Sequence, residues 1–356
     1  MRWLAWGQVL NEERYCAQSI LSILDFVDEL HLTEGAVGYA YWAGPYGLSS
    51  DRTAEIIRDL PGYGKKLFLH RVGWLPTKRQ LRNMSLCMAT RANPSWPNHH
   101  GSDTCALILD LDEVWDPADL QAADEAFSKD PTLQYIHCDL IQLRGDFEHY
   151  RDMTEGMQEH DLYNEQARKE EIACRNGVTL RQGRTAERLF RLQPNMHYVS
   201  HVCISDSYGR YLYTDPAYLG GREARMDIKF WHYNYLKPFP ETFTKFCYFA
   251  QQDGGKKRND EEMVDRALNE GYIKYLFTGT HPKGAWPVAP LPPHLTHPAI
   301  MGAHPDRHKT EREIADPTGE WLVPGAPDAP GYREKIMAML REGSKYVGPD
   351  LSKLVV

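Results

Sequence analysis

The sequence of 356 residues lacks several features that would assign it to particular protein classes. It has no run of about 20 apolar residues that could cross a bilayer. Its opening stretch, MRWLAWGQVLNEE, lacks the basic start and the longer apolar segment of a secretory signal. Basic residues are not in excess either, since the formal charge is −8 at pH 7, which gives no general attraction to nucleic acid. We therefore expect a cytoplasmic protein without a membrane span.

Paired cysteines are also missing. The seven cysteines are scattered, form no CxxC pair and lie mostly in apolar runs. This pattern favours reduced thiols in the core over a disulfide framework or a zinc site. With 42% hydrophobic and 25% charged residues, the chain resembles an ordinary soluble protein, with room for one large domain and additions, or for two domains.

An apolar run that fits a buried strand ends abruptly in a cluster of acidic residues, Asp110, Asp112 and Glu113. Carboxylates so close together repel one another, which raises their pKa values unless cations or hydrogen-bond donors compensate. Along an extended chain Asp110 and Asp112 point to the same side, where both can serve one ligand. Mg²⁺ and Mn²⁺ commonly bridge a carboxylate to substrate phosphates, so the pair indicates a nucleotide-diphosphate site. The alternative is an acidic turn in which Asp116 caps a helix beginning at Pro117.

Over the first 145 residues, strand-like and helix-like segments alternate, which predicts an α/β fold with a mainly parallel sheet covered by helices. The predicted strands are 3–10, 29–32, 66–72 and 106–109, and the predicted helices are 13–24, 51–60 and 78–92. Ligands of such sheets collect beyond the carboxyl ends of the strands. Asn11, Glu34 and the acidic cluster all follow such ends, so we expect them to converge on one pocket.

Four segments together resemble the family-2-type glycosyltransferases, which have the GT-A (Rossmann-like) nucleotide-sugar fold. VLNEERYCAQSILSIL is similar to the opening strand and loop of that family, and DELHLTEG with SSDRTAEII resembles its D-x-x-S-T-D-x-T block. RQLRNMSLCMA resembles its Arg-Asn helix, and LDLDEVWDP its D-x-D-E signature. The match covers roughly the first 120 residues, with weaker echoes to about residue 235. Glu34 is a departure, because the family usually has aspartate there.

The resemblance also implies a division of the chain. Residues 1–235 would form the GT-A domain, with nucleotide-sugar binding in 1–120 and a less regular acceptor side in 121–235. Residues 236–356 would form a helical and proline-rich C-terminal extension. Within it, residues 281–330 hold eleven of the 23 prolines, a composition that fits an extended ordered arm or a linker.

By the same resemblance, the acidic cluster holds the donor. Asp112 would coordinate Mn²⁺ or Mg²⁺, Asp110 would hold the ribose hydroxyls or support the metal through water, and Glu113 would orient the acceptor end of the sugar. His232 in FWHYNY is the candidate for a further metal ligand, with His201 as its rival. Either histidine could instead be a hydrogen-bonded core residue.

Other residues would bind the nucleotide. Asn11 and Glu34 would frame the nucleoside, and Asp51 would hold its loop in place. Arg79 and Arg82 lie one helical turn apart and can face the diphosphate together, or can belong to a solvated helix face.

The transfer itself needs a general base for the acceptor hydroxyl, and we expect Glu187, with Asp139 in reserve. An arginine cluster at 181, 184, 188 and 191 would suit a negatively charged acceptor, although such runs are usually solvated.

The expected function is a metal-dependent glycosyltransferase that moves a sugar from a nucleotide-diphosphate donor, most simply a UDP-sugar, to an acceptor hydroxyl with inversion. The acceptor would be a saccharide, a protein or a hydroxylated DNA base, the last making the enzyme DNA-modifying. A nucleotidyltransferase is an alternative, but VLNEERY stands where its glycine-rich, lysine-bearing phosphate loop would be. A non-catalytic nucleotide-sugar-binding protein is the other alternative.

Overall fold

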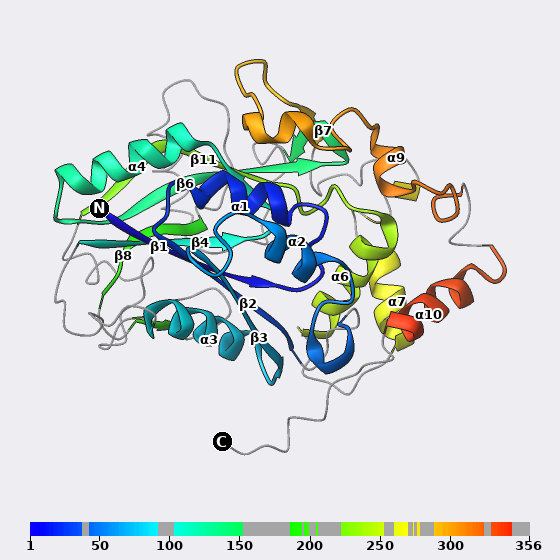
Figure 1. The fold of residues 1–356 in the computed structure, drawn as a ribbon. Coiled ribbons are helices and arrows are strands. Elements are labelled where there is room, and N and C mark those ends of the chain that lie inside the picture. Colours follow the sequence, from blue (N-terminus) through cyan, green and yellow to red (C-terminus); the bar gives the residue numbers. More distant parts are fainter. Residues whose placement is uncertain are drawn as a thin grey trace.

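The computed structural model describes most of the chain, and its centre is a β-sheet with helices on both faces (Figure 1). The described residues are 1–37, 43–91, 103–151, 186–193, 196–198, 204–205, 222–252, 260–269, 273, 276–277, 288–323 and 329–343. Within these ranges, no helix has the length and apolar character needed to cross a bilayer. The fold is α/β with a mixed, mainly parallel central sheet, as the alternating pattern predicts.

Four parallel strands form one side of the sheet, in the spatial order β4, β1, β2, β3, with β3 at the edge. They are β1 (Arg2–Val9), β2 (Glu29–Val37), β3 (Leu67–Leu75) and β4 (Thr104–Asp110). Between them run α1 (Cys16–Leu24), η1 (Pro45–Gly47), α2 (Thr53–Asp59) and α3 (Lys78–Arg91). Both β2 and β3 run past their predicted ends, because they pair with each other as far as Val37 and Leu75.

The sheet continues on the far side of β4 with less regular strands. These are β5 (Glu113–Trp115), β6 (Leu133–Arg144), β7 (Asp146–Arg151), β8 (Ala186–Arg191), β11 (Arg222–His232) and β12 (Val288–Pro290). Strand β8 runs antiparallel between β4 and β6, and β11 pairs with both β5 and β6. A separate pair is formed by β9 (His197–Tyr198) and β10 (Ile204–Ser205). Helix α4 (Pro117–Lys129) is capped by Asp116, whose carboxylate accepts from the N–H of Ala118 at 2.8 Å.

Alternation along β1 explains how both faces of the sheet are covered. Trp3 and Ala5 point to the face where α1 and α4 pack, whereas Leu4 and Trp6 point to the face covered by α3. Each large side chain buried in this way contributes about 1.5–3 kcal/mol. The cysteines at 16, 105, 138 and 247 are buried in the core, as expected.

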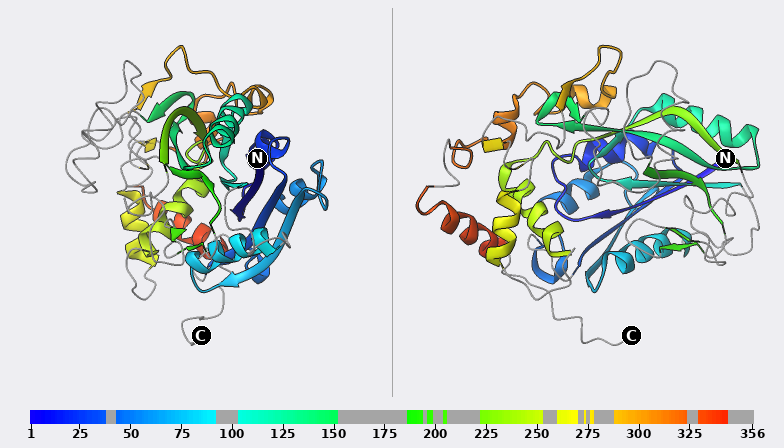
Figure 2. Two further views of the ribbon diagram at one scale, coloured as in Figure 1. Left: turned by 90° about the vertical axis from the view of Figure 1, so that its left-hand side faces the viewer. Right: turned by 180° about the vertical axis from the view of Figure 1, so that it is seen from behind.

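The C-terminal part lies at the end of the sheet where β1, β2 and β4 finish, as two further views show (Figure 2). It contains α6 (Phe239–Gln252), α7 (Asp260–Leu268), η2 (Ala299–Ala303), α9 (Glu311–Ala315) and α10 (Tyr332–Gly343). Helices α6, α7 and α10 share one apolar cluster. Of the proline-rich stretch, residues 288–323 are described, and Leu295, Met301 and Ile314 pack into a cluster with Trp231 of β11. The described part of this stretch therefore packs against β11.

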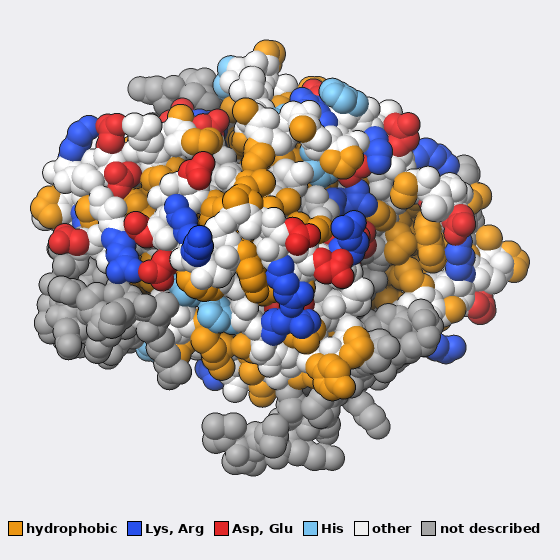
Figure 3. Space-filling model, viewed as in Figure 1, with side chains coloured by type: hydrophobic (Ala, Val, Ile, Leu, Met, Phe, Trp, Pro, Cys, Tyr) orange, Lys and Arg blue, Asp and Glu red, His pale blue; other side chains and the backbone are white. Residues whose placement is uncertain are grey.

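One face of the molecule carries basic and acidic side chains that are interspersed (Figure 3). Neither sign dominates this face, which agrees with the modest formal charge of the sequence.

Candidate functional site

A pocket of about 590 Å³ lies at the carboxyl ends of the central strands. Its floor comes from the segment after β1, the end of β2, helix α3 and the acidic turn after β4. The end of β11, helix α6 and two residues of α10 complete it. Its polar lining residues include Asn11, Glu12, Glu13, Arg14, Ser50, Asp51, Lys78, Arg82, Asp110, Asp112, His232, Asn234, Lys237, Glu241, Thr244 and Lys245. The structure therefore brings together most of the residues that the sequence indicates.

Asp110 lies at the pocket wall between two arginines. Its Oδ2 is 2.7 Å from Nη2 of Arg188, and its Oδ1 is 3.7 Å from Nη2 of Arg82. Burial by itself would raise the pKa of Asp110, but Arg188 and then Arg82 outweigh it and lower the pKa to about 2. The carboxylate is therefore ionised across the whole physiological range.

Asp112 is 4% exposed and meets three nitrogen groups. Its Oδ1 is 3.2 Å from Nε2 of His232, and its Oδ2 lies 3.6 Å from Nζ of Lys245 and 3.8 Å from Nζ of Lys237. Burial favours the neutral acid, but His232 and the two lysines reverse this and hold the pKa of Asp112 well below its usual value. The sequence indicates the aspartate and the histidine, but not the lysines.

Strand pairing explains why His232 reaches Asp112. Strand β11 runs antiparallel to β5, with His232 opposite Glu113, and the N–H of Tyr233 donates to the carbonyl oxygen of Asp112 at 2.8 Å. Two segments 120 residues apart are thus locked side by side by backbone hydrogen bonds.

Glu113 does not occupy the expected position. It is 1% exposed, is not among the described residues that line the pocket, and forms an ion pair with Arg188 behind the pocket wall. Burial raises the pKa of Glu113 to about 7 in spite of Arg188. This placement does not fit the expected contact of Glu113 with the sugar, because its carboxylate is paired with Arg188 and is not part of the described lining.

Asn11 and Asp51 line the pocket and hold the loop that precedes α2. Asn11 has a left-handed backbone (φ 53°), and its Oδ1 accepts from the N–H of Ser50 at 2.7 Å. The carboxylate of Asp51 accepts from the N–H groups of Thr53 at 3.0 Å and Glu13 at 3.2 Å. Asp51 therefore ties the loop to the segment after β1, as expected.

Glu34 is fully buried and lies beside the pocket instead of lining it. Its Oε2 is 2.6 Å from Nε of Arg71 on β3, and its Oε1 accepts from the N–H of Ser49 at 2.9 Å. Both carboxylate oxygens are thus engaged by the protein. In this arrangement Glu34 positions the loop at 49–51.

Helix α3 presents Lys78 and Arg82 to the pocket, whereas Arg79 is exposed and is not among the described lining residues. A spacing of four residues places side chains on one helix face, while neighbouring residues diverge by about 100°. The expectation that Arg79 and Arg82 face the pocket together does not agree with this placement. Burial against the wall, and then Arg82, lower the pKa of Lys78 to about 8. Helical spacing from Arg82 is the sequence signal that could have identified Lys78.

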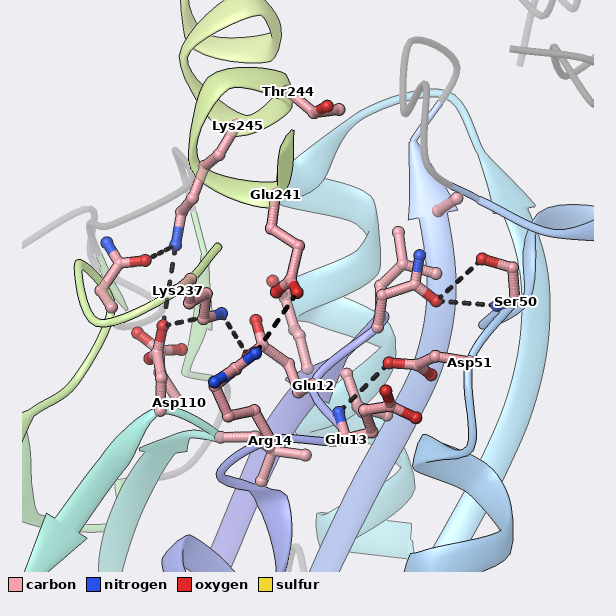
Figure 4. A pocket seen from close by; sticks show the side chains of 18 of the residues that line it. Glu12, Glu13, Arg14, Ser50, Asp51, Asp110, Lys237, Glu241, Thr244 and Lys245 are labelled. Atoms are coloured by element: carbon pink, nitrogen blue, oxygen red, sulfur yellow. Dashed lines mark hydrogen bonds and ion pairs between the residues drawn. The ribbon is translucent and has the colours of Figure 1, made fainter. Parts of the chain in front are cut away.

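The polar face of α6 closes the pocket from the other side (Figure 4). Glu241, Thr244 and Lys245 line the pocket at helical spacing, while Phe239 and Phe243 of the same helix pack into the apolar cluster with α7 and α10. Just before the helix, Lys237 is held by Glu12 at 2.6 Å between Nζ and Oε2. These residues lie beyond residue 235, where none of the candidate site residues was predicted. The amphipathic pattern of FPETFTKFCYF is the signal that could have found them.

The other candidates are not among the described residues that line the pocket. Glu187 falls on β8, but its side chain is outside the described residues, as is all of His201. Asp139 is half-buried on β6 and is not among the described lining residues. Arg191 is buried and donates to the carbonyl oxygens of Leu133 at 2.7 Å and Asp130 at 3.0 Å. Arg188 is paired with Asp110 and Glu113, so two members of the arginine cluster have structural partners, and the other two lie outside the described residues.

A divalent ion at Asp112 would need several oxygen or nitrogen ligands around it. Among the described residues, no cluster of three or more His, Cys, Asp or Glu side chains has the arrangement of a metal site. Asp112 and His232 nevertheless offer an oxygen and a nitrogen 3.2 Å apart. Adjacent ligands of an octahedral ion at about 2.1 Å lie about 3.0 Å from each other. The pair fits two coordination positions of an ion that takes its other ligands from a substrate and water.

Comparison with known proteins gives little further guidance. No protein-family model matches the chain, and the search of curated proteins also finds no match. Among solved structures, the chain is similar to S. aureus TarS residues 1–349, with 13% identity and a TM-score of 0.36 over 78% of this chain and 73% of that one. It is also similar to S. aureus TarS at 14% identity and the same TM-score, covering 79% of this chain and 46% of that one. Likenesses this weak leave the functional argument to the pocket itself.

Proposed function

We propose that the protein is a glycosyltransferase that binds a nucleoside-diphosphate sugar in this pocket and transfers the sugar, with inversion, to an acceptor hydroxyl. One observation supports this above all: Asp110, Asp112 and His232 meet in one pocket that is also lined by basic side chains of α3 and α6. A diphosphate needs both positive charge and a carboxylate-bound cation, and a strand-end pocket is where such ligands bind in open α/β sheets.

The position of each residue in the pocket suggests its role in binding the donor. Asp112 and His232 would hold Mn²⁺ or Mg²⁺. When bound, a divalent ion supplies positive charge that stabilises the departing diphosphate. Lys78 and Arg82 add positive charge from α3, which is worth more in a partly desolvated pocket than in water. Asp110, held between two arginines, is positioned to accept hydrogen bonds from the donor's ribose.

The opposite end of the pocket would take the base of the nucleoside. Asn11, Ser50 and Asp51 lie there on a loop that is tied down by hydrogen bonds, so its polar atoms are fixed before any ligand arrives. UDP is the proposed nucleotide. Glu187 remains the proposed general base, on the strand that also carries Arg188.

A thermal-shift panel tests the proposed function. UDP-, GDP-, CDP- and dTDP-sugars are added with and without Mn²⁺, and a UDP-sugar with Mn²⁺ should raise the melting temperature most, because a ligand that binds only the folded state stabilises it by mass action. An Asp112→Asn variant is the matched control and should lose that shift. If no nucleotide sugar stabilises the wild-type protein, the proposed function is wrong.

The acceptor is then identified by transfer assays. The selected donor is offered with saccharides, a protein extract and DNA that contains hydroxylated bases. Labelled sugar on one of these classes identifies the acceptor, and hydrolysis without transfer to any of them would argue against a transferase.

A further inference from the structure

The two carboxylate oxygens of Asp112 have different partners. One oxygen, Oδ1, faces His232 at 3.2 Å, and the other, Oδ2, faces the ammonium groups of Lys245 at 3.6 Å and Lys237 at 3.8 Å. A divalent ion held by Asp112 and His232 would therefore share its carboxylate with two positive charges. Like charges so close repel each other strongly in a partly desolvated site.

The two lysines are not equivalent. Lys237 has a side chain that is 7% exposed and is fixed by Glu12 at 2.6 Å. Lys245 has a side chain that is 29% exposed, and it projects from α6 into the pocket, where it also contacts Oδ1 of Asn234 (Figure 4). A lysine on a flexible four-carbon stem can redirect its ammonium group when it is not buried. Lys245 is thus the counter-ion of Asp112 that is able to move.

A bound diphosphate would offer the ammonium group of Lys245 a second ion-pair partner. Lys78 and Arg82 line the pocket from α3, while Lys245 lines it from α6. Lys78 and Lys245 also interact electrostatically, as the lowered pKa of Lys78 reflects after burial and Arg82. An anion placed between these helices would relieve the repulsion among three cations and would attract the ammonium group of Lys245.

We propose that Lys245 is an exchangeable counter-ion: it neutralises Asp112 in the empty pocket and turns to the diphosphate when a divalent ion and a nucleoside diphosphate bind together. The proposal rests on the function proposed above. It makes the binding of the ion and that of the nucleotide cooperative, because the ion alone must compete with Lys245 for Asp112. By thermodynamic linkage, each ligand must strengthen the other by the same factor.

The test measures binding and does not depend on turnover. Free Mn²⁺ is titrated by electron paramagnetic resonance, and UDP binding in saturating Mn²⁺ is followed by calorimetry, for the wild type and for Lys245→Met. We expect Lys245→Met to bind Mn²⁺ alone at least about fivefold more tightly, since a competing charge is gone. The same variant should bind UDP in Mn²⁺ about tenfold more weakly, since a charge-assisted contact is lost.

Two variants serve as controls. Lys129→Met removes an exposed lysine that is paired with Glu125 on α4, a helix that contributes no residue to the described lining of the pocket, and should change neither affinity. In an Asp112→Asn background, Lys245→Met should no longer tighten Mn²⁺ binding, because no carboxylate charge is left to compete for.

The possible results separate the two proposals. If wild type binds UDP with Mn²⁺ but Lys245→Met binds Mn²⁺ alone no better than wild type, the counter-ion role is wrong and the proposed function stands. If both affinities fall together in Lys245→Met with an unchanged melting temperature, Lys245 only supports the site and the exchange is again wrong. If the wild type binds no nucleoside diphosphate with Mn²⁺, the proposed function itself fails.

Discussion

Replacing Arg188 by methionine should destabilise the protein in a way that depends on pH. Arg188 is 12% exposed at its side chain and bridges two carboxylates, Asp110 at 2.7 Å and Glu113 through two nitrogens. Both carboxylates, in turn, raise the pKa of Arg188, so the guanidinium stays charged. Arg188→Met keeps most of the side-chain volume and removes the charge.

The expected loss of unfolding free energy follows from the carboxylates that lose their partner. Removing one member of a buried ion pair typically costs about 3–5 kcal/mol, because the remaining charge has no partner. Asp110 keeps Arg82 at 3.7 Å, so most of the cost falls on Glu113. The carboxylate of Glu113 can avoid this cost by taking up a proton, which removes its charge. Its pKa is already raised from 4.5 to about 7 by burial, and loss of Arg188 should raise it further.

The direction of the pH dependence is therefore fixed. A carboxyl group whose pKa is higher in the folded than in the unfolded state favours folding at low pH, and this contribution is lost as pH rises through the folded-state pKa. We expect the variant to lose about 3 kcal/mol of unfolding free energy at pH 8.5, and clearly less at pH 6, where Glu113 is protonated.

Urea unfolding followed by circular dichroism at the two pH values measures this difference. The double variant Arg188→Met with Glu113→Gln should recover much of the stability at pH 8.5, since the uncompensated charge is gone. Arg52→Met, at an exposed ion pair with Glu55, is the matched control and should have little effect. A loss that is equal at both pH values and is not recovered by Glu113→Gln would refute the reasoning.

Three further predictions concern the site and its surroundings. Asp112→Asn should abolish Mn²⁺-dependent UDP binding in calorimetry without lowering the melting temperature by more than a few degrees, and unchanged binding would remove Asp112 from the site. Glu34→Ala should weaken UDP affinity because the loop at 49–51 loses its anchor, whereas Glu34→Gln, which keeps an acceptor for the N–H of Ser49, should retain most of the affinity; equal losses would contradict this. Burial lowers the pKa of His297 from 6.5 to about 4, so as the pH falls this histidine is protonated in the unfolded state before it is protonated in the folded state. The free energy of unfolding should therefore fall by up to about 3 kcal/mol between pH 6.5 and pH 4. His297→Gln should reduce that fall in urea titrations, and a wild-type stability that is constant over this window would show the idea to be wrong.

Much of the order of strands and helices could be predicted from the sequence. Apolar residues are spaced differently in strands and in helices, and this spacing changes along the chain. Strand β4 is one example, since the buried run 105–109 ends where Asp110 begins to face the pocket. Elements of this kind depend on neighbours only a few residues away, and local patterns describe them well. The same reasoning fails for Glu113, because its partner Arg188 is 75 residues away.

The placement of single side chains also required the folded chain. Arg79 and Arg82 are equally plausible from residue type, but the helix turns Arg79 to solvent and gives its expected place to Lys78. Glu34 lies within β2 and not after it, and Arg71 on the adjacent strand pairs with it and makes it a support of the loop. Such outcomes depend on which neighbours a strand or helix acquires.

The α/β sheet and the place of Asp110 and Asp112 at its carboxyl edge could be predicted from the sequence, because both follow from local spacing. The groups that surround those carboxylates depend instead on the packing of distant elements. The antiparallel pairing of β5 with β11 brings His232 to Asp112, and burial of one face of α6 against the C-terminal helices turns Lys245 toward the same carboxylate. Contacts between segments more than a hundred residues apart depend on how whole elements pack, and no local pattern carries that information.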